Sequence, residues 1–171
     1  MEALSGAAAS ADSEGSIDPS TTQLRLVNRL LHRWREAASD GVFPSIDNID
    51  PWVIGDDWKD CLLIAIEAPV EASRLIAIGE HLLVRPQWQW QTLSVAEVPE
   101  DSLISVIASR LHSVVALRDC VIDEGEIAAD GGMILYRCAL LPLAADGAEI
   151  DHVLAAVNCK LVPAASARQA P

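Results

Sequence analysis

Two long apolar runs near the C-terminus dominate the hydrophobic pattern of this chain. They span residues 132–143 and 151–162, and an Ala145-Asp146-Gly147 turn separates them. Apolar runs joined by an Asp-Gly turn are typical of a β-hairpin. Because few polar residues interrupt either run, we expect both to be central strands of an antiparallel sheet that other elements must cover.

Five shorter segments complete the expected set of elements. Strands are predicted over residues 61–67, 73–79 and 118–128, an amphipathic leading helix over 22–39, and a longer helix over 103–117. Asp40-Gly41 is typical of the end of the first helix, and Asp101 or Ser102 is placed to cap the second.

This order of elements predicts an α+β fold with a five-stranded antiparallel sheet in spatial order 2-1-5-4-3 and helices over one face. The first two strands form one hairpin and the last three form a meander. Pairing of strand 5 with strand 1 joins the two parts into a single sheet. The face beneath the helices is expected to carry Leu63, Ile76, Leu135 and Val157.

Length and charge narrow the possible partners. At 171 residues, the chain fits one domain over 20–162, with a disordered acidic tail over 1–19 and a second disordered tail over 163–171. The net charge of −13 disfavours nucleic acid and anionic membranes, because binding to either needs a surplus of Lys and Arg. Without a secretory segment or an apolar run of roughly 18 residues, the sequence predicts a cytoplasmic protein.

Two stretches of the chain carry a family resemblance. The first is Arg29-Leu-Leu-His-Arg-Trp-Arg-Glu, followed by Phe43-Pro-Ser-Ile-Asp-Asn-Ile-Asp-Pro. The second is Tyr136-Arg-Cys-Ala-Leu-Leu-Pro-Leu, followed by Asp146-Gly and Asp151-His-Val-Leu-Ala-Ala-Val-Asn. They resemble the beginning and the end of a bacterial, mostly alphaproteobacterial, family of stand-alone PAS domains. The resemblance implies a PAS-like sheet, a helical segment between its second and third strands, and a role in signal transduction as a sensor or regulatory protein.

The middle of the chain departs from that family. Its members usually continue from the second strand through a Gly-Thr segment into Phe-Gly-x-Asp-Leu-Thr-Gly, a stretch that helps to wall the PAS cavity. Here Gly79-Glu-His-Leu-Leu runs instead into Pro86 and Trp88-Gln-Trp.

The sequence offers few residues for catalysis or cofactor binding. Four cysteines lack zinc or haem-attachment spacing and are expected to be buried thiols: Cys61, Cys120, Cys138 and Cys159. His112 stands near the position of the haem ligand of some oxygen-sensing PAS domains, but no other haem-site residue accompanies it. Asn158-Cys159-Lys160 lies on the wrong strand for the reactive cysteine of flavin-binding PAS domains. With no P-loop, dinucleotide or zinc-protease pattern, we expect no metal, no cofactor and no enzyme activity.

The first function consistent with these observations is a regulatory module that acts by protein–protein interaction. A homodimer and an unidentified signalling protein are its expected partners. Its interaction candidates form the apolar arc of the leading helix: Leu26, Val27, Leu30, Leu31 and Trp34. The same arc also fits a helix that packs only on its own domain, and both arrangements stay open.

The alternative function is a small-molecule sensor. Its apolar ligand would lie between the 103–117 helix and the sheet. Ser105, Ser109 and His112 are the candidate polar groups of this pocket, which is expected to be small and empty of cofactor.

Overall fold

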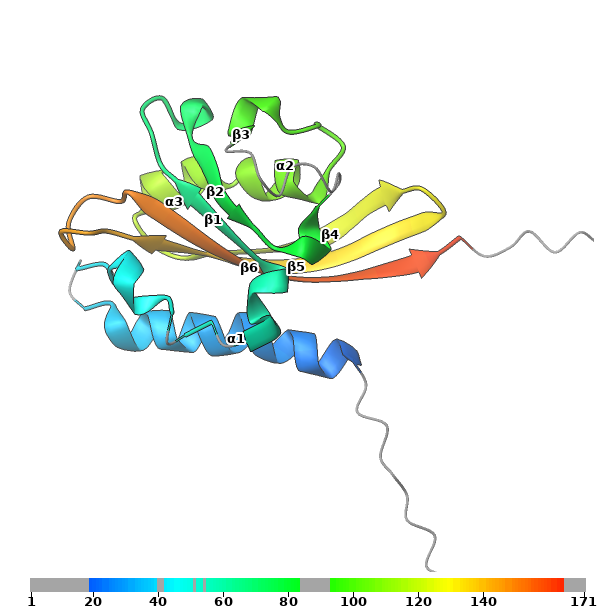
Figure 1. The fold of residues 1–171 in the computed structure, drawn as a ribbon, viewed down its shortest axis with the longest axis horizontal. Coiled ribbons are helices and arrows are strands. Elements are labelled where there is room, and N and C mark those ends of the chain that lie inside the picture. Colours follow the sequence, from blue (N-terminus) through cyan, green and yellow to red (C-terminus); the bar gives the residue numbers. More distant parts are fainter. Residues whose placement is uncertain (1–18, 40–41, 51, 54, 84–92, 165–171) are drawn as a thin grey trace, which may run out of the picture.

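The computed structural model describes residues 19–39, 42–50, 52–53, 55–83 and 93–164, without the side chains of residues 19–25. The predicted tails lie almost wholly outside these residues, and so does the Asp40-Gly41 helix end. The described part forms three layers, with helix α1 on one side of a sheet and helices α2 and α3 on the other (Figure 1).

The helices are short except for the first. They are α1 (Pro19–Ala37), α2 (Leu103–Ala108) and α3 (Leu111–Leu117). The strands are β1 (Cys61–Ala65), β2 (Arg74–Ile78), β3 (Leu93–Ser94), β4 (Val121–Ala129), β5 (Gly132–Leu143) and β6 (His152–Pro163). No helix among the described residues is long and apolar enough to cross a membrane.

The sheet is antiparallel, with six strands in the order β3-β2-β1-β6-β5-β4. The prediction of five strands in the order 2-1-5-4-3 is therefore wrong in its strand count, because β3 extends the sheet beyond β2. β3 has only two residues, which pair as Arg74↔Ser94 and Leu75↔Leu93. A strand this short has no alternating pattern, so the sequence carries no signal for it.

The helix predicted over 103–117 is interrupted. Ser102 caps α2 as expected, and its Oγ accepts a hydrogen bond from the backbone N–H of Ser105 at 3.1 Å. The break follows at Ser109, whose Oγ donates to the carbonyl of Val106 at 2.6 Å. Serine side chains that bond the preceding turn compete with the helical backbone pattern, and here they accompany its end.

The apolar arc of α1 packs on this chain's own sheet. Leu26, Val27, Leu30, Leu31 and Trp34 are all buried against β5 and β6. The indole Nε1 of Trp34 donates to the carbonyl of Pro142 at 2.7 Å. Of the two arrangements that the sequence left open for this arc, the structure shows packing on the chain's own domain. The physical reason is that the sheet has a second apolar face, which α1 covers.

The single inner face expected for the sheet is also wrong. Val157 lies beneath α2 and α3, but Leu63 lies on the opposite face, beneath α1. Ile76 and Leu135 are exposed rather than buried. Because the central strands are apolar on both faces, alternation along them does not distinguish one face from the other.

Replacing Leu30 with alanine should lower the free energy of unfolding by about 2–5 kcal/mol, because the side chain is fully buried beneath the sheet. Chemical denaturation measures the change. Arg33→Ala, on the exposed side of α1, is the control and should alter stability by at most about 0.5 kcal/mol. A Leu30→Ala protein with unchanged stability but a lower mass in solution would place this side chain between subunits instead.

Candidate functional site

The three predicted pocket residues do not meet in a cavity. His112 is exposed, and its Nε2 lies 2.8 Å from a carboxylate oxygen of Glu71. Ser109 is exposed and bonded to its own helix, while Ser105 is half-buried in α2. The space between these helices and the sheet is filled by buried apolar side chains, including Ile104 and Ile107.

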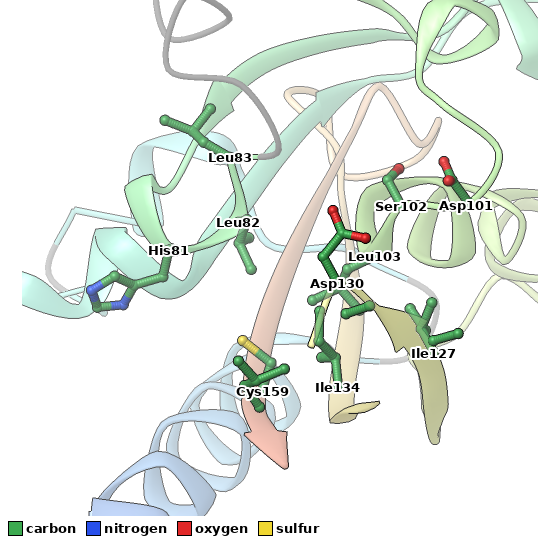
Figure 2. A pocket seen from close by; sticks show the side chains of 13 residues that line it. His81, Leu82, Leu83, Asp101, Ser102, Leu103, Ile127, Asp130, Ile134 and Cys159 are labelled. Atoms are coloured by element: carbon green, nitrogen blue, oxygen red, sulfur yellow. The ribbon is translucent and has the colours of Figure 1, made fainter. Parts of the chain in front are cut away.

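A groove of about 600 Å³ lies instead at the end of the sheet where the β4–β5 hairpin turns (Figure 2). Side chains from three strands form one side of it, namely Ile127, Ile134, Cys159 and Leu161. The opposite side comes from residues 81–83 and from the beginning of α2, at residues 101–103. Residues 84–92, which contain the divergent Trp88-Gln-Trp segment, lie outside the described residues.

Among the described residues, the groove has an apolar floor and few polar side chains that the fold orients toward it. Asp101 and Asp130 place exposed carboxylates at its rim. The Oγ of Ser102 is already engaged with α2 and with the carbonyl of Pro99 at 2.7 Å. The ring of His81 is held by Asp60 at 2.9 Å. The groove is suited to hold an apolar group rather than to orient a polar one.

The thiol of Cys159 lies in this groove, but it is not activated. Burial, followed by the nearby charge of Asp60, raises the pKa of Cys159. Burial also raises the pKa values of Cys61 and Cys138, each to about 12. A nucleophilic cysteine needs a lowered pKa, so these thiols are neutral at pH 7. Among the residues the structure describes, no cluster of three or more His, Cys, Asp or Glu side chains could hold a metal ion.

A second candidate surface lies on the opposite face of the sheet, on β4 and the adjacent part of β5. We call it the outer β4 face and define it by Ile122, Glu124, Glu126 and Leu135. The strand register places these four side chains on the same side as α1. Ile122 is 42% exposed and Leu135 is 43% exposed, although both are large apolar residues. This surface is therefore partly apolar and carries two acidic side chains.

The inner side of β4 is held by a polar network that the sequence analysis missed. The guanidinium of Arg110 donates two hydrogen bonds to Asp123, at 2.9 and 3.3 Å, and the hydroxyl of Tyr136 donates a third at 3.1 Å. Burial and the hydrogen bond to Asp123 raise the pKa of Tyr136. The three residues come from separate elements, so no sequence spacing signals the contact.

Comparisons with known proteins add little to this geometry. No family model matches the chain, and no curated protein matches it. One similar solved structure is a sensory box sensor histidine kinase from Vibrio cholerae, with a TM-score of 0.41 and 11% identity over 60% of this chain and 82% of that chain. A likeness this weak carries no argument about function.

In the folded protein, the alkylation rate of Cys159 should level off only at a pH above the ordinary thiol pKa, because its raised pKa delays formation of the reactive thiolate. The same cysteine in the urea-unfolded protein should level off earlier, near the ordinary thiol pKa of about 8.5. Mass spectrometry of the Cys159 peptide after short exposures to iodoacetamide gives both rates. Coinciding pH profiles would show that the fold does not shift this thiol.

Proposed function

We propose that this chain is a PAS-type signalling or regulatory module that acts by protein–protein interaction and not by catalysis. The observation that carries the proposal is the outer β4 face, where Ile122 and Leu135 stay exposed although both faces of the central strands are covered. The Glu124–Arg137 pair lies between these two side chains on the ladder, so apolar and charged groups alternate along a face that a partner protein could cover. The resemblance of the sequence to PAS domains supports the same function.

The chemistry of the described side chains supports a binding role over catalysis. His81, His112 and His152 each contact a carboxylate, and none is hydrogen-bonded to a Ser or Cys side chain within the described residues. Acyl transfer needs such a base beside an activated nucleophile. The raised pKa values of Cys61, Cys138 and Cys159 likewise disfavour nucleophilic catalysis by these thiols.

A small-molecule sensor is the second candidate, because the groove supplies a specific place for a ligand. Its floor, with Ile127, Ile134 and Leu161, suits an apolar group. The carboxylates of Asp101 and Asp130 at the rim favour a ligand whose polar end is cationic.

The double variant Ile122→Asp/Leu135→Asp should weaken binding of the protein partner at least about tenfold, because it places charge in the apolar part of the surface. The wild-type chain first retains the partner from an extract of the organism that encodes it, and calorimetry with the purified partner then gives Kd. Leu117→Asp changes an exposed leucine at the end of α3 and should leave Kd unchanged. A wild type that retains no protein, or a double variant with unaltered Kd, argues against the proposal.

Protein isolated from the same organism and then denatured should release no stoichiometric small molecule, because the described lining of the groove orients few polar groups. Mass spectrometry of the released fraction tests this. Ile134→Trp fills the groove, and Ile76→Trp adds the same volume on exposed β2. A compound released by the wild type and by Ile76→Trp, but not by Ile134→Trp, would favour the sensor function over the interaction function.

A further inference from the structure

The sheet ends at β4 with a long unpaired edge. β4 has nine residues, and β5 is its neighbour on one side only. On its other side, no described residue makes a backbone hydrogen bond to it. Edge strands in soluble proteins commonly carry Lys or Pro, which discourages pairing with another strand. β4 has neither, and its charged residues are all acidic.

The strand register shows which backbone groups face this free edge. Ala129 and Gly132 flank a two-residue turn, so they form the hydrogen-bonded pair that closes the hairpin. Pairs alternate along an antiparallel ladder. The N–H and C=O groups of Ile122, Glu124 and Glu126 therefore point away from β5, toward the free edge. The side chains of the same three residues belong to the outer β4 face.

The charge on this edge indicates which partner side chains would fit beside it. Glu124 is 71% exposed at its side chain, and Arg137 approaches it only to 3.9 Å. Glu126 is exposed and forms no ion pair with a described residue. Asp123 faces the other way and is engaged by Arg110 and Tyr136. The edge thus presents two carboxylates at alternate positions, in a chain with a net charge of −13.

A second copy of this chain fits the edge poorly. If two β4 strands paired antiparallel over their full length, Gly125 would lie at the twofold axis and Glu124 of each copy would face Glu126 of the other. Like charges directly opposite each other across strands are destabilising. The flanking sequences are no better suited. Residues 1–18 contain acidic but no basic side chains, and residues 165–171 contain one arginine.

We propose that the free edge of β4 binds an extended, basic segment of a partner protein by strand addition. This inference rests on the proposed function and specifies the chemistry of its partner. The partner's backbone pairs with Ile122, Glu124 and Glu126, while its alternate Lys or Arg side chains lie beside the two glutamates. Main-chain hydrogen bonds supply affinity in this mode of binding, and alternate side chains supply specificity.

A fluorescent nonapeptide of alternating lysine and valine tests the proposal by fluorescence anisotropy with the full chain. It should bind at least tenfold more tightly than the matching glutamate–valine peptide. Methylation of alternate backbone nitrogens on the hydrogen-bonding side should abolish binding, because it removes the donors that pair with β4. Equal affinity of the methylated and unmethylated peptides overturns strand addition.

Variants of β4 test the same contact from the protein's side. Glu124→Lys/Glu126→Lys should lose the lysine peptide and gain the glutamate peptide. Glu36→Lys/Glu100→Lys makes the same change in net charge at exposed positions elsewhere and should bind like the wild type. Equal losses in the two double variants would show attraction to net charge alone, which overturns the proposal.

A second pair of variants isolates the contribution of the backbone hydrogen bond at the edge. Glu124→Ala and Glu124→Pro remove the same charge, but only proline removes the edge N–H, so Glu124→Pro should bind at least tenfold more weakly than Glu124→Ala. Proline is tolerated where an edge-strand N–H faces solvent, and circular dichroism checks the fold. Indistinguishable affinities of two folded variants overturn the proposal.

Two further outcomes separate this inference from the proposed function. A chain that retains a partner through Ile122 and Leu135, yet shows no preference for the lysine peptide, overturns strand addition and leaves the proposed function standing. A concentration-dependent dimer that Glu124→Pro abolishes makes a second copy the occupant of the edge and overturns the basic partner.

Discussion

The apolar character of both faces of the central strands is the constraint on which the rest of the molecule depends. Leu62 and Leu140 point toward α2 and α3, while Leu63 and Leu154 point toward α1. Leaving apolar surface in water costs roughly 25 cal/mol per Å², so each face needs its own cover. α1 therefore belongs to the core of the fold, and the hydrogen bond from Trp34 to the β5 backbone attaches it there.

The helical layers end before the sheet does, and the groove lies where β4 and β5 extend past them (Figure 1). The outer β4 face lies instead along the lateral edge of the sheet. On one face, Ile127 and Leu161 line the groove. On the other face, Leu135 stays exposed, and the edge of β4 is open beside it. The Arg110–Asp123 contact holds β4 in place from the helical side. A partner would therefore meet a strand that is already fixed in position.

Local patterns were informative where neighbours in the sequence decide the structure. The β5–β6 hairpin and the Ser102 cap formed close to the predicted positions, because turn and capping chemistry acts within a few residues. The candidate pocket was not predictable in this way. Ser109 and His112 were placed on one continuous helix, but the helix breaks at Ser109 and both side chains lie outside the groove. Amphipathicity shows that α1 has a face to bury, but not which surface covers it.

The sequence by itself determined the α+β class, most of the strands and helices, and the acidic charge that disfavours nucleic acid as a partner. These properties follow from composition and from periodicities of two and 3.6 residues, which need no knowledge of distant contacts. Only the tertiary structure decided that Leu30 and Leu141 share one core cluster, that Cys159 joins Leu82 in a groove, and that Glu124 stands on a free edge. Those outcomes depend on contacts between segments far apart in the chain. The spacing of residues within one segment does not show which distant segment it packs against.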